Sequence, residues 1–114
     1  MSPDLLKCRI FVSAGITDMR KSINGLSAMV SEQMELNPLG GDLFLFSNGG
    51  KLLKALYWDR NGFCLWQKRL EKHRFPWPKA GNSVVELSDQ QLKWLLAGID
   101  FFNAHEELKF SSVN

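Results

Sequence analysis

The hydrophobic positions in the first third of the chain change their spacing once, from a strand pattern to a helix pattern. Residues 9–13, RIFVS, are rich in β-branched and aromatic side chains and precede an Ala-Gly pair, which predicts a strand and then a turn. This turn is followed by a helical spacing of apolar residues, at Met19, Ile23, Leu26, Val30 and Met34. We predict a helix with Thr17 or Asp18 as its N-cap and an end at Asn37-Pro38.

Three strand-like segments follow, over residues 43–47, 51–58 and 63–70. The connections between them, Asn-Gly-Gly and Asp-Arg-Asn-Gly, tolerate positive φ and predict hairpin turns. Connections this short join only antiparallel neighbours, so residues 43–70 should form a meander. Within residues 52–58 Lys54 is the only plainly polar residue, so both faces of the sheet need cover, from helices or from a second subunit.

The last third predicts one more strand and a second helix. Residues 84–87, VVEL, read as a short strand, and Ser88 to Gln91 has the form of a capping box. Leu87 and Leu92 are spaced as a hydrophobic staple. The buried stripe of this helix should consist of Leu92, Leu95, Leu96 and Ile99. We therefore predict a single α+β domain over residues 1–114, in which an antiparallel meander sheet of four to five strands packs with two amphipathic helices. Its ordered core should span about residues 9–101, with a frayed tail over 102–114.

Composition supports a folded protein that does not enter a membrane. Hydrophobic residues make up 45% of the 114, which argues against disorder, and the longest apolar runs are far shorter than a membrane span. The opening MSPDLLKC does not resemble a secretion signal. Cys8 and Cys64 lack CxxC spacing and lie in apolar segments, so we expect buried thiols. These features predict a cytoplasmic location.

A net charge of +2 hides a strongly basic middle third. Residues 51–79 hold eight Lys or Arg side chains against Asp59 and Glu71, a local charge of +6 (eight minus two). The stretch KRLEKHRFPWPKA adds large aromatic side chains to this charge. One interpretation is a polyanion-binding surface, in which Lys and Arg release counterions from nucleic acid and an aromatic ring stacks on unpaired bases. The other is a solvated basic rim whose aromatic residues belong to the core.

Under the first interpretation, we predict three kinds of contact with DNA. Phosphates would be contacted by Lys68, Arg69, Lys72 and Arg74. Lys54 and Arg60 would flank these contacts, and Trp77 would stack on a base.

The sequence offers little that resembles an active site. His73 and His105 have no carboxylate or cysteine at metal-ligand spacing, and no serine lies in a nucleophile-elbow motif. Asp18, Asp42 and Asp59 would need to converge to form a nuclease site, and caps or turns explain Asp18 and Asp59 without one. We expect a non-enzyme without a catalytic residue, metal or cofactor.

Four stretches together resemble a known family over about residues 9–100: AGITDMRKSINGL, LFLFSN-GGK, ALYWDRNGFCLWQKRLEKHRFPWP and ELSDQQLKWLLAGIDF. They resemble the accessory protein from the second open reading frame of multi-gene bacterial insertion sequences. This TnpB-type accessory family is unrelated to the RNA-guided nucleases that share the label. The resemblance implies a cytoplasmic protein that assists transposition beside a separate DDE-type transposase. The sequence departs from the family at Pro76, which implies an edge strand or an interrupted strand.

The family pattern falls on several polar residues, among them Thr17, Asp18, Arg20, Asp59 and Asp100. The TDMR segment that contains the first three is either a partner site or a structural unit. In the structural interpretation, which we favour, the segment provides a helix cap, and Arg20 forms an ion pair with Asp59 or Asp100.

Two hypotheses about activity remain open. In the first, the protein contacts DNA at the ends of the element through the basic 51–79 region. In the second, it is a scaffold module that binds the transposase, the first-frame protein or a second copy of itself, and its charge affects only solubility and encounter rate.

Overall fold

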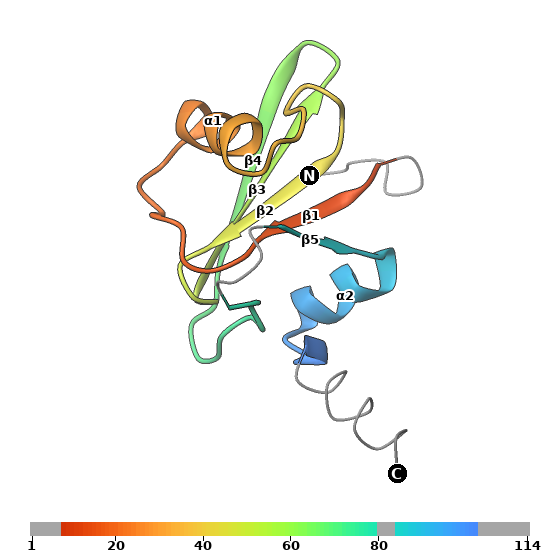
Figure 1. Cartoon of the computed structure of the whole chain (residues 1–114). Helices are drawn as coiled ribbons and strands as arrows, with labels where there is room; N and C mark the ends of the chain where they lie inside the picture. The colour runs from red at the N-terminus through yellow and green to blue at the C-terminus, as the bar shows by residue number, and fades with distance from the viewer. Residues whose placement is uncertain (1–7, 80–83, 103–114) are drawn as a thin grey trace.

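The computed structural model describes residues 8–79 and 84–102, which form a five-stranded sheet and two helices (Figure 1). The elements in chain order are β1 (Ile10–Ser13), α1 (Ile23–Glu32), β2 (Leu43–Ser47), β3 (Leu52–Asp59), β4 (Gly62–Arg69), β5 (Val84–Leu87) and α2 (Asp89–Ala97). The predicted α+β class is confirmed, and each predicted strand is present within one residue of its expected bounds.

The strands lie in the order β4-β3-β2-β1-β5, and the sheet is mixed. Short turns make β2, β3 and β4 the predicted antiparallel meander. β1 instead runs parallel to β2, with Phe11 opposite Phe44, because the chain between them crosses over through α1. On the other side of β1, β5 pairs antiparallel, with Phe11 opposite Glu86.

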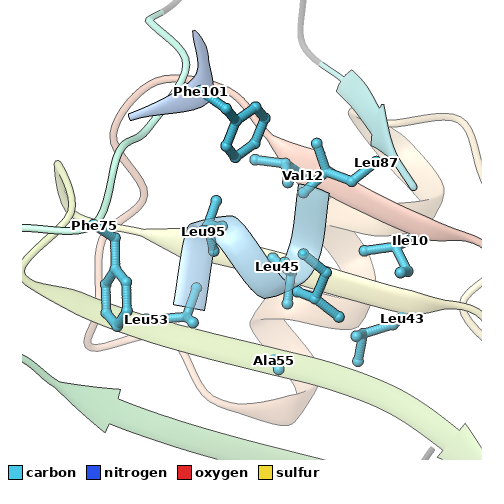
Figure 2. Packing of buried hydrophobic residues seen from close by; sticks show 11 residues of the cluster. Ile10, Val12, Leu43, Leu45, Leu53, Ala55, Phe75, Leu87, Leu95 and Phe101 are labelled. Atoms are coloured by element: carbon cyan, nitrogen blue, oxygen red, sulfur yellow. The ribbon is translucent and has the colours of Figure 1, made fainter. Parts of the chain in front are cut away.

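Two apolar clusters, one on each face, hold the sheet between the helices. α1 covers one face, where Leu26, Val30 and Met34 meet the aromatic residues Phe11, Phe44 and Phe46. On the other face, the core of Ile10, Val12, Leu43 and Leu45 meets Leu92 and Leu95 of α2. Figure 2 shows that Phe75 and Phe101 complete this second cluster. The expectation that helices cover both faces is therefore correct for these parts of the sheet.

The predicted bounds of the first helix are wrong at both ends. The helix begins at Ile23, after Ser22, because the backbone N–H of Thr17 donates to the Ser47 carbonyl at 2.8 Å and keeps the preceding chain along the end of β2. Thr17 and Asp18 are therefore not N-caps. At the other end the helix stops at Glu32, and a positive φ of 56° at Glu35 turns the chain away.

The second helix confirms its predicted start and three of the four residues of its predicted stripe, since Leu92 and Leu95 are buried and Leu96 packs against the same cluster. The Ser88 side chain accepts from the Gln91 N–H at 3.1 Å, and the Gln91 side chain accepts from the Ser88 N–H, which completes the capping box. Gly98 ends the helix with a φ of 81°, so Ile99 lies beyond it and is 51% exposed rather than buried. The predicted frayed tail lies outside the described residues, apart from Phe102.

Two smaller expectations concern Pro76 and the cysteines. Pro76 is buried in a stretch without regular secondary structure, which matches the predicted interruption of a strand. Cys8 and Cys64 are thiols rather than half-cystines, as expected, but both are half-buried rather than fully buried.

Candidate nucleic-acid interface

Six of the eight basic side chains in residues 51–79 lie around one end of the sheet, where residues 70–79 wrap around the β2–β3 turn. The Leu70 N–H donates to the Lys51 carbonyl at 2.9 Å, and the Phe75 N–H donates to the Gly50 carbonyl at 2.6 Å. Further along, the Pro78 carbonyl accepts from the Gly15 N–H at 2.9 Å. We call the exposed cations along this path the cationic end: Lys51, Lys68, Arg69, Lys72, Arg74 and Lys79.

Gly50 permits this wrapping. Its φ is +104°, and a Cβ atom at this position would collide with the carbonyl oxygen of Phe75. The Arg74 guanidinium lies over the same turn, where its Nη1 donates to the Gly49 carbonyl at 3.4 Å. The glycines that mark a hairpin in the sequence therefore also bring Arg74 and Phe75 close to the start of β3.

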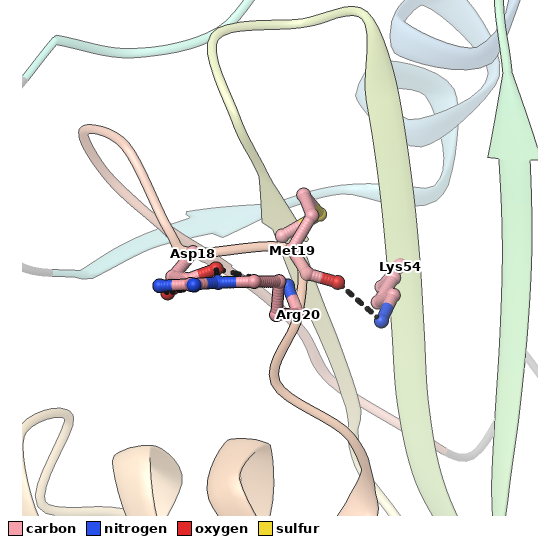
Figure 3. A network of polar contacts seen from close by, with 4 residues as sticks. All are labelled: Asp18, Met19, Arg20 and Lys54. Atoms are coloured by element: carbon pink, nitrogen blue, oxygen red, sulfur yellow. Dashed lines mark hydrogen bonds and ion pairs between the residues drawn. The ribbon is translucent and has the colours of Figure 1, made fainter.

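Lys54 does not belong to the predicted contact surface. The residue is only 7% exposed, and its Nζ donates to the Met19 carbonyl oxygen at 2.7 Å (Figure 3). The same Nζ donates to the Lys21 carbonyl oxygen, also at 2.7 Å. Lys54 occupies an inner strand, between Phe46 of β2 and Gln67 of β4, on the face that α1 covers. Its ammonium group is used inside the molecule, where it holds residues 19–21 against the sheet.

Arg60 lies at the opposite end of the β3–β4 hairpin from the cationic end. The eight residues of β4 separate the two positions by about 23 Å at the usual rise per residue of a strand. Arg60 is 91% exposed and its nearest acidic partner is Asp59, at 3.6 Å. Arg60 is therefore not positioned to flank the contacts of Lys68 and Arg69.

Lys68 and Arg69 point to opposite faces of the sheet because successive residues of a strand alternate. Lys68 shares its face with Trp66, on the side of α2, whereas Arg69 shares its face with Leu65, on the side of α1. The Arg69 guanidinium is 3.2 Å from the Glu71 carboxylate. The cationic end therefore curves around the edge of the sheet instead of forming one flat face.

The aromatic residues of the basic segment pack towards the core. Phe75 is 2% exposed and belongs to the cluster on the α2 face. Trp77 is half-buried against the same cluster, and its indole N–H donates to the Ser13 carbonyl at 3.1 Å. These contacts match the core interpretation of both rings, so we leave Trp77 out of the proposed contacts.

The TDMR segment forms a compact loop beside α1. The Arg20 guanidinium pairs with the Asp18 carboxylate at 2.7 Å, and the Arg20 N–H donates to the same carboxylate at 2.9 Å (Figure 3). The proposed pairing of Arg20 with Asp59 or Asp100 is thus wrong: Arg20 pairs with Asp18. Asp59 lies beside Arg60 at the far hairpin turn, and Asp100 is exposed just after α2.

The Asp18–Arg20 pair gives a prediction for pH dependence. Hydrogen bonds from the Arg20 side chain, and then from its backbone N–H, hold the pKa of the Asp18 carboxyl well below its ordinary value. The contribution of this pair to stability is therefore present above the ordinary aspartate pKa and is lost as pH falls towards the folded value. We expect the carboxyl ¹³C resonance of Asp18 to remain that of a carboxylate at about pH 3, and Arg20→Gln to restore ordinary titration. Ordinary titration in the wild type would contradict this prediction.

Two cations of the cationic end are missing from the DNA contacts predicted from the sequence. Lys51 and Lys79 belong to the basic region of residues 51–79 but have no predicted contact with DNA. The Asn-Gly-Gly turn was a usable signal for Lys51, since it places this residue at the same end of the sheet as the last residues of β4.

The described residues do not assemble a metal site. Among residues 8–79 and 84–102, no group of three or more His, Cys, Asp and Glu side chains is placed to hold a metal ion. Asp18 and Asp42, two members of the considered nuclease triad, lie beyond opposite ends of β2. Asp42 instead accepts a hydrogen bond from the Arg9 N–H at 2.9 Å. His105 lies outside the described residues.

In the part of the chain that the structure describes, neither helix has the length and apolar character needed to cross a bilayer. The fold and site thus define a small α+β domain with a cationic sheet end.

Comparison with known proteins assigns this domain to a family. The profile of the family described as "IS66 Orf2 like protein" matches residues 8–106. Two curated relatives come from Sinorhizobium fredii (strain NBRC 101917 / NGR234). "Uncharacterized protein y4hO" is 41% identical over 99% of both chains, and "Uncharacterized protein y4jC" is 33% identical over 82% of this chain and 80% of its own. No solved structure matches the chain. The chain belongs to the IS66 Orf2-like family and is an accessory protein of an insertion sequence.

Proposed function

We propose that the protein is a non-catalytic accessory factor that contacts DNA during transposition through its cationic end. The observation that carries the proposal is the wrapping of residues 70–79 around the β2–β3 turn. This wrapping brings six exposed cations from three segments of the chain to one end of the sheet. A row of phosphates would be bound there by charge and counterion release.

The geometry favours contact with the DNA backbone over base reading. The cations come from a strand end and from irregular segments, and the described helices do not form a helix-turn-helix pair that would place one of them in a major groove. Phosphate contacts position a protein on DNA without reading its sequence. We therefore infer binding with weak sequence preference, in the cytoplasm, next to the proteins that cut and join the element.

Lys72 and Arg60 provide a matched test of this location. Both are exposed, but Lys72 lies at the cationic end and Arg60 at the opposite end of the β3–β4 hairpin. In filter binding with DNA from the element ends over a salt series, Lys72→Ala should reduce the log–log slope by about one unit, whereas Arg60→Ala should leave it unchanged. No binding by the wild type at low salt, or equal effects of both variants, would refute the proposal.

A second candidate function is binding of another element-encoded protein through the loop of residues 16–20. Ile16 is 81% exposed, and its two neighbours are held by the backbone hydrogen bonds of Gly15 to Pro78 and Thr17 to Ser47. An exposed apolar side chain on a fixed loop is suited to a partner protein. Co-purification with the transposase and the first-frame protein tests this function. The uncharged substitution Ile16→Ser should abolish capture while leaving DNA affinity unchanged, because it removes apolar surface without adding charge near the cationic end. Capture of the partner by the Ile16→Ser variant would argue against a role for this loop.

A further inference from the structure

Within the part of the chain that the structure describes, the outer edge of β4 lacks the usual protection of an edge strand. Among residues 8–79 and 84–102, β4 pairs only with β3, whereas the strand at the other edge, β5, has four residues. The β3–β4 register runs without a bulge from Leu52–Arg69 to Asp59–Gly62, and β4 contains no proline. Natural edges are usually short, bulged, covered or charged, because unpaired backbone groups attract another strand. The charge of β4 is confined to its last two residues.

One hydrogen bond at the end of the β3–β4 pairing shows which backbone groups of β4 point away from the sheet. The Leu70 N–H donates to the Lys51 carbonyl, so these two residues form a hydrogen-bonded pair. Antiparallel ladders alternate hydrogen-bonded and non-hydrogen-bonded pairs, and the β3–β4 register continues from this pair. The even-numbered residues of β4 therefore bond to β3. The residues whose N–H and C=O groups point away from the sheet are Phe63, Leu65, Gln67 and Arg69.

Apolar side chains next to this edge are only half-buried. Trp66 and Tyr57 lie on the face of α2, and Cys64 shares this face because it is opposite Tyr57, but α2 packs mainly against β5, at the other edge of the sheet. On the opposite face, Phe63 and Leu65 are also half-buried beside the α1 cluster. A strand added to β4 would bury apolar surface on both faces while it satisfied the unpaired backbone groups.

We propose that β4 pairs antiparallel with β4 of a second copy of this chain, with Trp66 on the two-fold axis. This register uses all four outward-facing residues, because Phe63 then lies opposite Arg69 of the second copy and Leu65 lies opposite Gln67. The two Trp66 side chains face each other in a non-hydrogen-bonded pair, where Cα atoms are about 4.5 Å apart. The interface is isologous and closes at two chains.

The distribution of charge along β4 favours this arrangement. Antiparallel pairing places Arg69 against the ring of Phe63, and Lys68 against Cys64, so the cations of the two copies do not face each other. Parallel pairing would bring the two Lys68–Arg69 ends side by side, which like-charge repulsion disfavours. The two five-stranded sheets become one continuous sheet, with a cationic end at each of its opposite sides.

The first test is the oligomeric state of the full chain. Gln67→Pro removes one outward N–H at an exposed position, a change that an edge strand tolerates and that a paired strand does not. Over a concentration series in sedimentation equilibrium, we expect a dimer for the wild type and for Gln67→Ala, and a monomer with unchanged circular dichroism for Gln67→Pro. A monomeric wild type, or a Gln67→Pro variant that remains a dimer, would overturn the proposal.

The second test determines the register through the native Cys64. In the proposed dimer Lys68→Cys lies opposite Cys64 of the second copy, so two intermolecular disulfides should form on mild oxidation. Within one chain the same two positions are about 13 Å apart along the strand, too far for a disulfide. Arg69→Cys is the control, since its side chain is on the other face. Equal cross-linking of both variants, or none in Lys68→Cys, would refute this register. Neither test depends on DNA binding.

Discussion

Alanine substitution of Lys68, Arg69, Lys72 and Arg74 together is expected to reduce the slope of log affinity against log salt by about 3 to 4 units. Each phosphate contact on duplex DNA contributes about 0.9 to that slope through counterion release, and this variant removes four candidate contacts. Filter binding or fluorescence anisotropy with element-end DNA measures the slope. The effect should be uniform across unrelated DNA sequences, because the proposed contacts are with phosphates rather than base edges.

The matching control removes cations away from the cationic end. Arg60 lies at the far hairpin turn and Lys93 is exposed on α2, so Arg60→Ala with Lys93→Ala lowers the net charge without changing the candidate interface. This variant should retain the wild-type slope. If the salt slope fell in both the quadruple and the double alanine variants in proportion to the charge removed, DNA binding would depend on net charge alone. That result would contradict a localised interface.

Replacing Lys54 with methionine is expected to destabilise the fold by about 1–3 kcal/mol. Methionine fills a similar volume, but it leaves the carbonyl oxygens of Met19 and Lys21 without the donor that now lies 2.7 Å from each. Hydrogen exchange should increase most at residues 19–21, because these two bonds fix the loop to the sheet. Urea denaturation and amide exchange measure both effects.

Lys72→Met is the control for this prediction. It makes the same chemical change at an exposed residue and should alter the free energy of unfolding by no more than about 0.5 kcal/mol. Equal stability of Lys54→Met and the wild type would show that the buried ammonium group does not hold the loop.

The sequence predicts the strands and the second helix well because their signals are local. Alternation, β-branched residues and glycine turns specify β2, β3 and β4, and the Ser88–Gln91 capping box specifies the start of α2. The start of α1 is mispredicted because Met19 packs beside the α1 cluster from a loop. The position of Met19 in the sequence fits the spacing of a helix. The hydrogen bond from the Thr17 N–H to the Ser47 carbonyl, however, holds this part of the backbone in a non-helical conformation.

The candidate site is predictable only in part. The meander itself implies that the β3–β4 turn, and hence Arg60, lies at the opposite end of the sheet from the β2–β3 turn. The burial of Lys54 has no such signal, because a lysine in a strand is ordinarily a solvent-facing residue. Its position depends on two carbonyl groups more than 30 residues away in the chain. The alternation of Lys68 and Arg69 between faces follows directly from the strand period.

The central claim is that DNA contacts the end of the sheet formed by the β2–β3 turn and residues 68–79. A titration of the ¹⁵N-labelled protein with element-end DNA, followed by ¹H–¹⁵N correlation spectra, tests it residue by residue. We predict salt-sensitive shifts at residues 49–51 and 68–79, with residues 58–62 at the other hairpin turn unchanged. Shifts confined to residues 58–62, or none at low salt, would contradict it.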